Sequence, residues 1–244
     1  MKIDRERGVI SFTLATLLFL LAPLAANSAE NFAAHITKLD GKAFASRSGG
    51  SMRTLRVNDR LYARERVITG RKTSIDLKFT DGTALALGSS TIVTVDSYAY
   101  RAKSASQQSG QQEETFSMSI LQGAVRAVTG LLAKRRPFSV RFKTKVATIG
   151  IRGTHFAAEV DGDSATIILL AQKDPTASNA IEVSNAFGKV EIDTAGYGTE
   201  IPDAKSPPSP PRKMSATHNM ARTLRSVQTT GRVRIPSIPR GGMR

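Results

Sequence analysis

Short runs of alternating apolar and polar residues, separated by turn dipeptides, constrain the fold of this chain more than any other feature. Residues 74–80 (SIDLKFT) alternate strictly, and residues 84–87 (ALAL) follow after Asp81-Gly82. Period-two alternation places every second side chain on one face, which is typical of a half-buried β-strand. An Asp-Gly pair between such runs predicts a hairpin whose two central residues both have positive φ.

The pattern recurs along most of the chain and predicts an all-β fold. Further runs occupy residues 34–45, 156–170 and 181–192, the first two around Asp-Gly pairs at 40–41 and 161–162 and the third around a turn at 185–188. We expect one domain over residues 31–200, built from short antiparallel strands and hairpins as a sandwich or a solenoid. Residues 100–114 contain almost no large apolar side chain, so a solvated loop is expected there.

Residues 118–132 are ambiguous. Leu121, Val125, Val128 and Leu132 have helical spacing. Gly123 and Gly130, however, would each cost a helix about 1 kcal/mol. Periodicity alone therefore leaves both helix and strand open for this segment.

The first 29 residues have the pattern of a secretory signal peptide. A charged lead over residues 1–12 is followed by an apolar stretch at 14–26 and by small residues up to Ala29. The apolar stretch is shorter than the roughly 20 residues that span a bilayer. We expect cleavage after Ser28 or Ala29, with an uncleaved membrane anchor as the alternative. Either way residues 30–244 should be exported, and we place them in the periplasm.

Composition excludes several kinds of chemistry. The chain has no Cys, which excludes disulfides, thiolate metal sites and a Cys nucleophile. Its three His residues lie far apart in sequence, which argues against a His-rich metal cluster. Lys and Arg total 35 against 20 Asp and Glu, a net charge of +15, which favours an anionic partner. Export argues against nucleic acid as that partner.

More than half of this charge lies in the C-terminal segment 201–244, which we expect to be a disordered tail. It contains PPSPP, few aromatic residues and many Arg, so it cannot bury enough apolar surface to fold. Its cations could attach to an anionic membrane surface or to cell-wall acids. The alternative is a tail that only aids solubility. The candidate contacts are Arg212, Lys213, Arg222, Arg225, Arg232 and Arg234.

Catalytic and metal-binding alternatives find little support, and no catalytic, cofactor or metal residue is predicted. Glu113 and Glu114 could be paired carboxylates for glycoside chemistry, but they lie in a polar loop. His155 could form a triad with Thr154 and Asp161, yet no nucleophile elbow accompanies it. The Asp-Gly-Asp run at 161–163 lacks the terminal acidic ligand of a calcium loop, so a hairpin turn is favoured.

Residues 146–156 (VATIGIRGTHF) resemble the hallmark of the FecR domain family, and upstream steps match in order at 55–61, 67–70, 77–87 and 121–126. The resemblance covers about residues 40–160, although Asn58 stands where the family usually has Gly. It implies an all-β periplasmic module and favours a strand over 118–132. The motif residues are Asp59, Thr69, Gly70, Asp81, Gly82, Gly123, Gly150, Ile151, Arg152, Gly153, Thr154 and Phe156.

The resemblance also frames the expected function. Well-known FecR proteins are membrane-spanning sigma-factor regulators, whereas this sequence shows neither their cytoplasmic helices nor an internal membrane span. We therefore expect a non-catalytic binding or scaffold module that recognises an envelope protein or a cell-wall polymer. The alternative is an accessory regulator of iron or siderophore signalling that acts with a separate membrane partner. Within the motif, Arg152 could contact a ligand, but an internal clamp on a turn is favoured.

Overall fold

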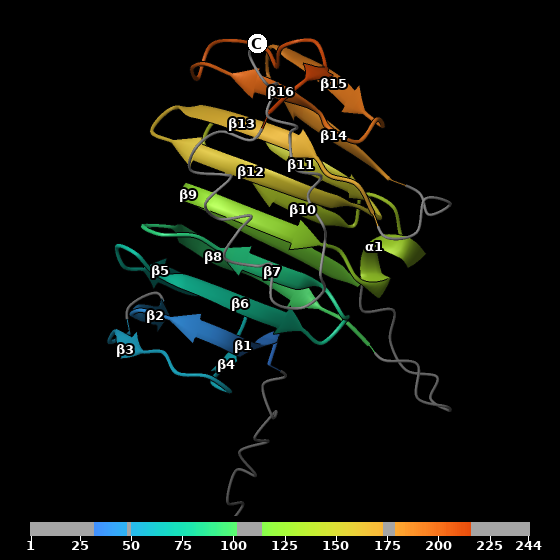
Figure 1. Ribbon diagram of the computed structural model, residues 1–244. Coiled ribbons are helices and arrows are strands. Elements are labelled where there is room, and N and C mark those ends of the chain that lie inside the picture. Colours follow the sequence, from blue (N-terminus) through green and yellow to red (C-terminus); the bar gives the residue numbers. More distant parts are fainter. Residues whose placement is uncertain (1–31, 48–49, 102–113, 173–178, 216–244) are drawn as a thin grey trace, which may run out of the picture. The chain divides into compact units, whose positions relative to one another are not determined.

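The computed structural model describes residues 32–47, 50–101, 114–172 and 179–215 (Figure 1). The expected signal peptide at 1–29 lies outside these residues. The elements are β1 (Ala34–Asp40), β2 (Ala43–Arg47), β3 (Arg53–Thr54), β4 (Arg60–Leu61), β5 (Glu65–Thr69), β6 (Ser74–Phe79), β7 (Ala84–Leu87), β8 (Ile92–Ala99), β9 (Thr115–Val128), α1 (Leu131–Arg135), β10 (Val140–Lys143), β11 (Thr148–Arg152), β12 (His155–Asp161), β13 (Ser164–Leu169), β14 (Ala180–Asn185), β15 (Gly188–Ile192), β16 (Tyr197–Ile201) and β17 (Arg212–Lys213). No helix within the described ranges has the length and hydropathy that a membrane crossing requires.

The strands form two layers that share β9. The first layer has the order β4-β1-β6-β7-β9-β12-β13-β16-β17. The second has the order β3-β2-β5-β8-β9-β10-β11-β14-β15. Neighbours are antiparallel except for the parallel pair β9 and β10. Figure 1 shows these strands in rows from β1 to β16. The all-β prediction and the strand within residues 118–132 are confirmed.

Strand β9 passes from one layer to the other near Gly123. Its first half pairs with β8 in the second layer, and its second half pairs with β7 and β12 in the first. The positions that lie in the core are Phe116, Met118 and Ile120 before the crossing and Val125 and Ala127 after it. The inward face therefore changes from even to odd numbers, because the strand bends and the register shifts there. Of the β9 residues with helical spacing, only Val125 is buried, whereas Leu121 and Val128 are exposed, so that spacing does not mark the inward face.

A single hydrophobic core lies between the two layers and contains residues from both. Four buried phenylalanines run through it. The ring centroids of Phe79 and Phe116 are 4.6 Å apart, those of Phe116 and Phe142 are 5.7 Å apart, and those of Phe142 and Phe156 are 4.9 Å apart. Phe79 and Phe156 belong to the first layer and the other two to the second. These contacts hold the layers face to face.

Buried threonines fix the turns at which the chain crosses between the layers. The Oγ1 of Thr73 accepts a hydrogen bond from Lys42 N and donates one to Lys42 O, both at 3.1 Å. The Oγ1 of Thr91 does the same for Ala124, at 3.2 and 3.3 Å. Each threonine lies directly beneath a glycine, since a Cβ on Gly41 or Gly123 would lie 2.4 Å from its Oγ1. The same arrangement, a threonine hydroxyl bonded to the backbone beneath a glycine, thus joins neighbouring turns at which the chain changes layer.

The turn predicted at Asp81-Gly82 is correct in place but not in geometry. Only Gly82 has positive φ, at 89°, and its N–H donates to Phe79 O at 3.0 Å. The loop therefore has three residues and ends in a glycine, a hairpin type that tolerates Asp in its middle. The carboxylate of Asp81 is buried and accepts hydrogen bonds from the N–H and hydroxyl of Thr83.

The other two Asp-Gly pairs differ from each other. Asp161 ends β12, and the two loop residues are Gly162, with φ at 57°, and Asp163. This hairpin too has positive φ at one residue and not at both. Asp40-Gly41 is not a hairpin, because it leads from β1 in the first layer to β2 in the second.

The folded part extends past the predicted boundary at residue 200. Strand β17 pairs with β16, and Ser209 O accepts a hydrogen bond from the Thr199 hydroxyl at 2.7 Å. The expectation of disorder therefore does not hold for residues 201–215, while 216–244 lie outside the described residues. Packing against β16 supplies the ordering that composition alone did not predict.

Candidate functional site

The two threonines of the FecR-like motif are hydrogen-bonded inside the fold. The Oγ1 of Thr69 donates to Gly88 O at 2.6 Å and accepts from Thr91 N at 2.8 Å. The Oγ1 of Thr154 donates to Asn179 Oδ1 at 2.6 Å. Both threonines are buried, and their hydroxyl groups are hydrogen-bonded to groups at the turns between the two layers.

The hallmark segment itself is built into β11, β12 and the corner between them. Ile151 and Phe156 are fully buried in the core, and Gly153 turns the chain from one layer to the other. The Arg152 guanidinium lies 5.2 Å from the centre of the Phe138 ring and 3.3 Å from a Glu191 carboxylate oxygen. Both side chains of this ion pair are exposed, so the interpretation of Arg152 as an internal clamp stays a prediction.

The remaining motif residues also have structural positions. Asp59 accepts a hydrogen bond from Arg56 N at 2.8 Å, next to Asn58 with φ at 72°. Asn tolerates this left-handed conformation, which explains how it replaces the usual glycine. Gly70 N donates to Lys42 O at 2.9 Å, and Gly150 packs against the Phe138 ring. These motif residues therefore each contribute to a turn or a packing contact of the fold.

His155 belongs to a polar group on the outer face of the first layer. Its Nε2 lies 2.7 Å from Arg126 Nε, and its Nδ1 lies 2.7 Å from Ala171 O. Arg126 donates, so Nε2 accepts and Nδ1 carries the proton. Burial and the nearby Arg126 cation lower the His155 pKa to about 4, against a partial opposing effect of the bond to Ala171. Burial also lowers the pKa of Arg126 and raises that of Asp76.

The triad of Thr154, His155 and Asp161 that was considered from the sequence is not formed. Thr154 is bonded to Asn179, and Asp161 lies at the opposite end of β12. The contacts of His155 are therefore structural. A catalytic base would use Nε2 to take a proton from a nucleophile, but this nitrogen accepts a hydrogen bond from Arg126.

We predict that His155 makes the protein less stable as the pH falls from about 6.5 to about 4. Between these pH values His155 is protonated in the unfolded chain but neutral in the folded protein. Its contribution to the free energy of unfolding is therefore complete above the unfolded pKa and decreases as the pH falls toward the folded pKa. The loss should be on the order of 2 kcal/mol. Urea unfolding at several pH values should show this slope, and His155→Gln should flatten it. An imidazole NMR titration of His155 with an ordinary midpoint would contradict the prediction.

Two of the acidic residues that were considered as catalytic or metal-binding pairs form ion pairs with nearby basic side chains. Asp163 forms an ion pair with Lys145 at 2.9 Å. Glu114 lies 3.7 Å from Arg135 and accepts a hydrogen bond from Arg101 N, whereas Glu113 lies outside the described residues. Across the described ranges no three His, Asp or Glu residues gather as a metal site would require.

The candidate contacts of the tail are only partly described. Arg212 forms an ion pair with Glu200, and Lys213 pairs across the ladder with Tyr197. Arg222, Arg225, Arg232 and Arg234 lie outside the described residues.

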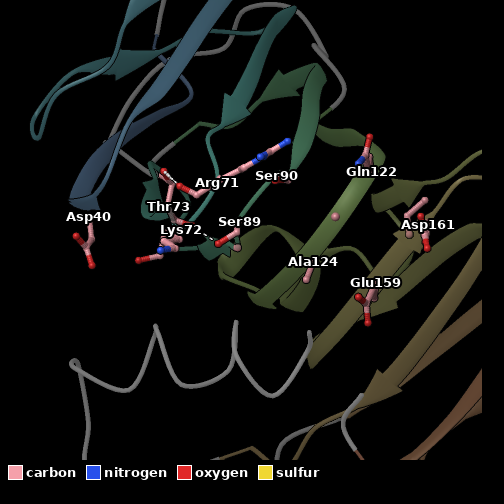
Figure 2. Close-up of a pocket in the computed structure, with 14 residues that line it drawn as sticks. Asp40, Arg71, Lys72, Thr73, Ser89, Ser90, Gln122, Ala124, Glu159 and Asp161 are labelled. Atoms are coloured by element: carbon pink, nitrogen blue, oxygen red, sulfur yellow. Dashed lines mark hydrogen bonds between the residues drawn. The ribbon is translucent and has the colours of Figure 1, made fainter. Parts of the chain in front are cut away.

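A cleft of about 920 Å³ lies over the crossing turns, and sequence reasoning did not identify it (Figure 2). It combines charged residues of both signs with hydroxyl groups. Its lining residues are Asp40, Arg71, Lys72, Thr73, Ser74, Gly88, Ser89, Ser90, Gln122, Gly123, Ala124, Glu159, Val160 and Asp161. The runs RKTS at 71–74 and GSST at 88–91 were a visible signal, but only the topology brings them together. This cleft is the candidate binding site.

Residues 65–173 match the family model described as FecR protein, which confirms the resemblance over β5 to β13. No curated protein matches the sequence.

Several solved structures are similar to parts of the chain. One, described as a cell surface anchoring domain, is 35% identical over 25% of this chain and 82% of its own, with a TM-score of 0.25. Two crystal structures of a proposed anti-sigma factor from Parabacteroides distasonis ATCC 8503 are 10% and 12% identical, with TM-scores of 0.43 and 0.42. Each of these two matches covers 62% of this chain and 60% of that one.

Proposed function

We propose that this FecR-type protein is an exported, non-catalytic binding module that recognises an envelope protein or a cell-wall polymer. The observation that carries the proposal is how the polar groups are distributed. The motif residues Thr69, Asp81 and Thr154 are buried and bonded internally, whereas the charged cleft is open. Within the described residues Arg71 and Lys72 form no ion pair, so they remain available to a partner.

A second candidate follows from the family match over residues 65–173. The domain would act as an accessory regulator of iron or siderophore signalling, beside a separate membrane partner. A deletion strain should then change the output of an iron-responsive reporter between iron-rich and iron-poor growth. Unchanged output in both media would remove this candidate.

The first test is a crosslinking pull-down from intact cells with the full chain and with a chain ending at Ser215. The shorter chain keeps β17 and its pairing to β16, so the described fold is intact. We expect both chains to capture the same envelope partner. Capture that needs residues 216–244 and disappears at high salt would show instead that the basic tail binds an anionic surface, since salt screens exposed charges.

A further inference from the structure

Strand β15 differs from the other strands that end the two layers. Among the described strands, β3 and β4 end the layers on one side, and β15 and β17 end them on the other. Figure 1 shows β15 in the uppermost row. β3, β4 and β17 have two residues each, whereas β15 has five. A longer edge strand offers more backbone groups to another strand, so β15 is the edge best suited to pairing.

The backbone on the outer edge of β15 can accept a further strand. Asn185 and Gly188 close the two-residue turn of the β14–β15 hairpin and form its first hydrogen-bonded pair. Because such pairs alternate with non-hydrogen-bonded ones, Val190 directs its N–H and C=O toward β14, whereas Lys189 and Glu191 direct theirs away. In the part of the chain that the structure describes, these outward backbone groups form no hydrogen bond. Two residues of β15 therefore present backbone donors and acceptors to a partner strand.

The charges of the four end strands favour a second copy of this chain at β15 and oppose it at the others. The charged residues of β3, β4 and β17 are all basic, namely Arg53, Arg60, Arg212 and Lys213. Like charges opposite each other destabilise a strand pair, so two copies repel each other at these edges. Strand β15 carries one charge of each sign, on Lys189 and Glu191, and both side chains are exposed. It is thus the neutral edge of a chain with a net charge of +15.

Antiparallel pairing of β15 with itself brings these opposite charges together. When Val190 of both copies lies on a two-fold axis, Lys189 of each copy lies opposite Glu191 of the other. These two residues also carry the outward backbone groups, so the two pairs exchange about four backbone hydrogen bonds. A register centred on Lys189 would instead place the two lysines opposite each other. Backbone geometry and side-chain charge therefore select the same register.

The charges already on this face favour that register as well. Glu191 lies opposite Glu182 on β14, and such a pair of like charges is unfavourable. Lys189 lies 3.2 Å from Glu182, and Arg152 lies 3.3 Å from Glu191. In the pairing above, Lys189 of the second copy would lie on the far side of Glu191. It would add a further cation beside the two glutamates, which a single copy of the chain does not supply at that edge.

We propose that β15 pairs antiparallel with β15 of a second copy, about a two-fold axis at Val190, and joins their second layers into one continuous sheet. The inference goes beyond the proposed function, because no residue that lines the cleft belongs to β15. A dimer would carry two clefts and so hold a repetitive partner at two points. A chain that captures an envelope partner but stays monomeric would reject the dimer alone and leave the proposed function standing.

The first test uses a single introduced cysteine, because the chain has none of its own. Val190→Cys places a thiol at the two-fold axis, where the Cβ atoms of facing residues lie about 5 Å apart. Mild oxidation of the full chain should therefore give a disulfide-linked dimer. Lys189→Cys is the matched control, since its copies lie roughly 8 Å apart on the diagonal, too far for a disulfide. Equal crosslinking of the two variants, or none with Val190→Cys, would overturn the proposal.

The second test reverses the charges and follows the self-association of the full chain by sedimentation equilibrium. Lys189→Glu and Glu191→Lys each place like charges opposite each other, so each variant alone should associate about tenfold more weakly. An equimolar mixture of the two variants restores opposite charges at both pairs and should recover the affinity. Lys143→Glu makes the same change of charge at an exposed position on β10 and should have no effect.

The mixture separates this pairing from other modes of association. A strand from a different protein on β15 would leave the purified chain monomeric, which contradicts the proposal. Association through another surface would be weakened equally by Lys143→Glu and Lys189→Glu, or by neither, and either result also contradicts it. Loss of association in each single variant together with recovery in the mixture supports β15 against β15 in the stated register.

Discussion

Replacing Gly123 by alanine will lower the free energy of unfolding by about 3 to 5 kcal/mol. Gly123 has φ at 90°, a conformation that strains any residue with a Cβ. The new Cβ would also lie 2.4 Å from Thr91 Oγ1 and 2.6 Å from Thr91 Cα. Backbone cannot yield as a flexible side chain can, so β9 would have to separate from the β7–β8 turn. Urea unfolding at neutral pH, followed by circular dichroism, measures the loss.

The matched control for this variant is Gly82→Ala. Gly82 has nearly the same φ, 89°, but a Cβ there would meet nothing within 4 Å. It should therefore lose only the cost of the left-handed conformation, about 1 kcal/mol. The difference between the two variants isolates the close approach of the crossings. Equal losses would show that the contact between Gly123 and Thr91 contributes nothing to stability.

Replacing Phe142 by alanine will destabilise the protein by about 3 to 5 kcal/mol. Its ring is fully buried and contacts Phe116 in its own layer and Phe156 in the other. The substitution opens a cavity between the layers, where the rigid pairing of β9, β10 and β12 prevents collapse. The midpoint of urea unfolding should fall without a change in its slope.

Phe187→Ala provides the comparison, because that ring lies on the β14–β15 hairpin and is 54% exposed. Its loss should stay within about 0.5 kcal/mol. A comparable loss in both variants would mean that Phe142 does not hold the layers together. Together, the two pairs of variants test the contact between Gly123 and Thr91 and the packing of Phe142 between the layers.

Local patterns predicted much of this structure. Alternation located the strands, and Asp-Gly pairs located two of the hairpins. The resemblance correctly favoured a strand for residues 118–132, where periodicity alone did not. Neither the local patterns nor the resemblance indicated the cleft, because its lining residues Arg71, Ser89, Gln122 and Glu159 come from four separate parts of the chain.

The sequence by itself determined the fold class, the positions of most strands and the resemblance to the FecR family, since these depend on side-chain alternation, turn residues and a contiguous motif. Only the tertiary structure decided that β9 serves both layers, that residues 201–215 pack on β16, and that His155 bonds Arg126. It alone also gathered the crossing turns into one cleft. The physical reason is that local propensity acts over a few residues, whereas layer crossings and burial depend on which distant strands become neighbours.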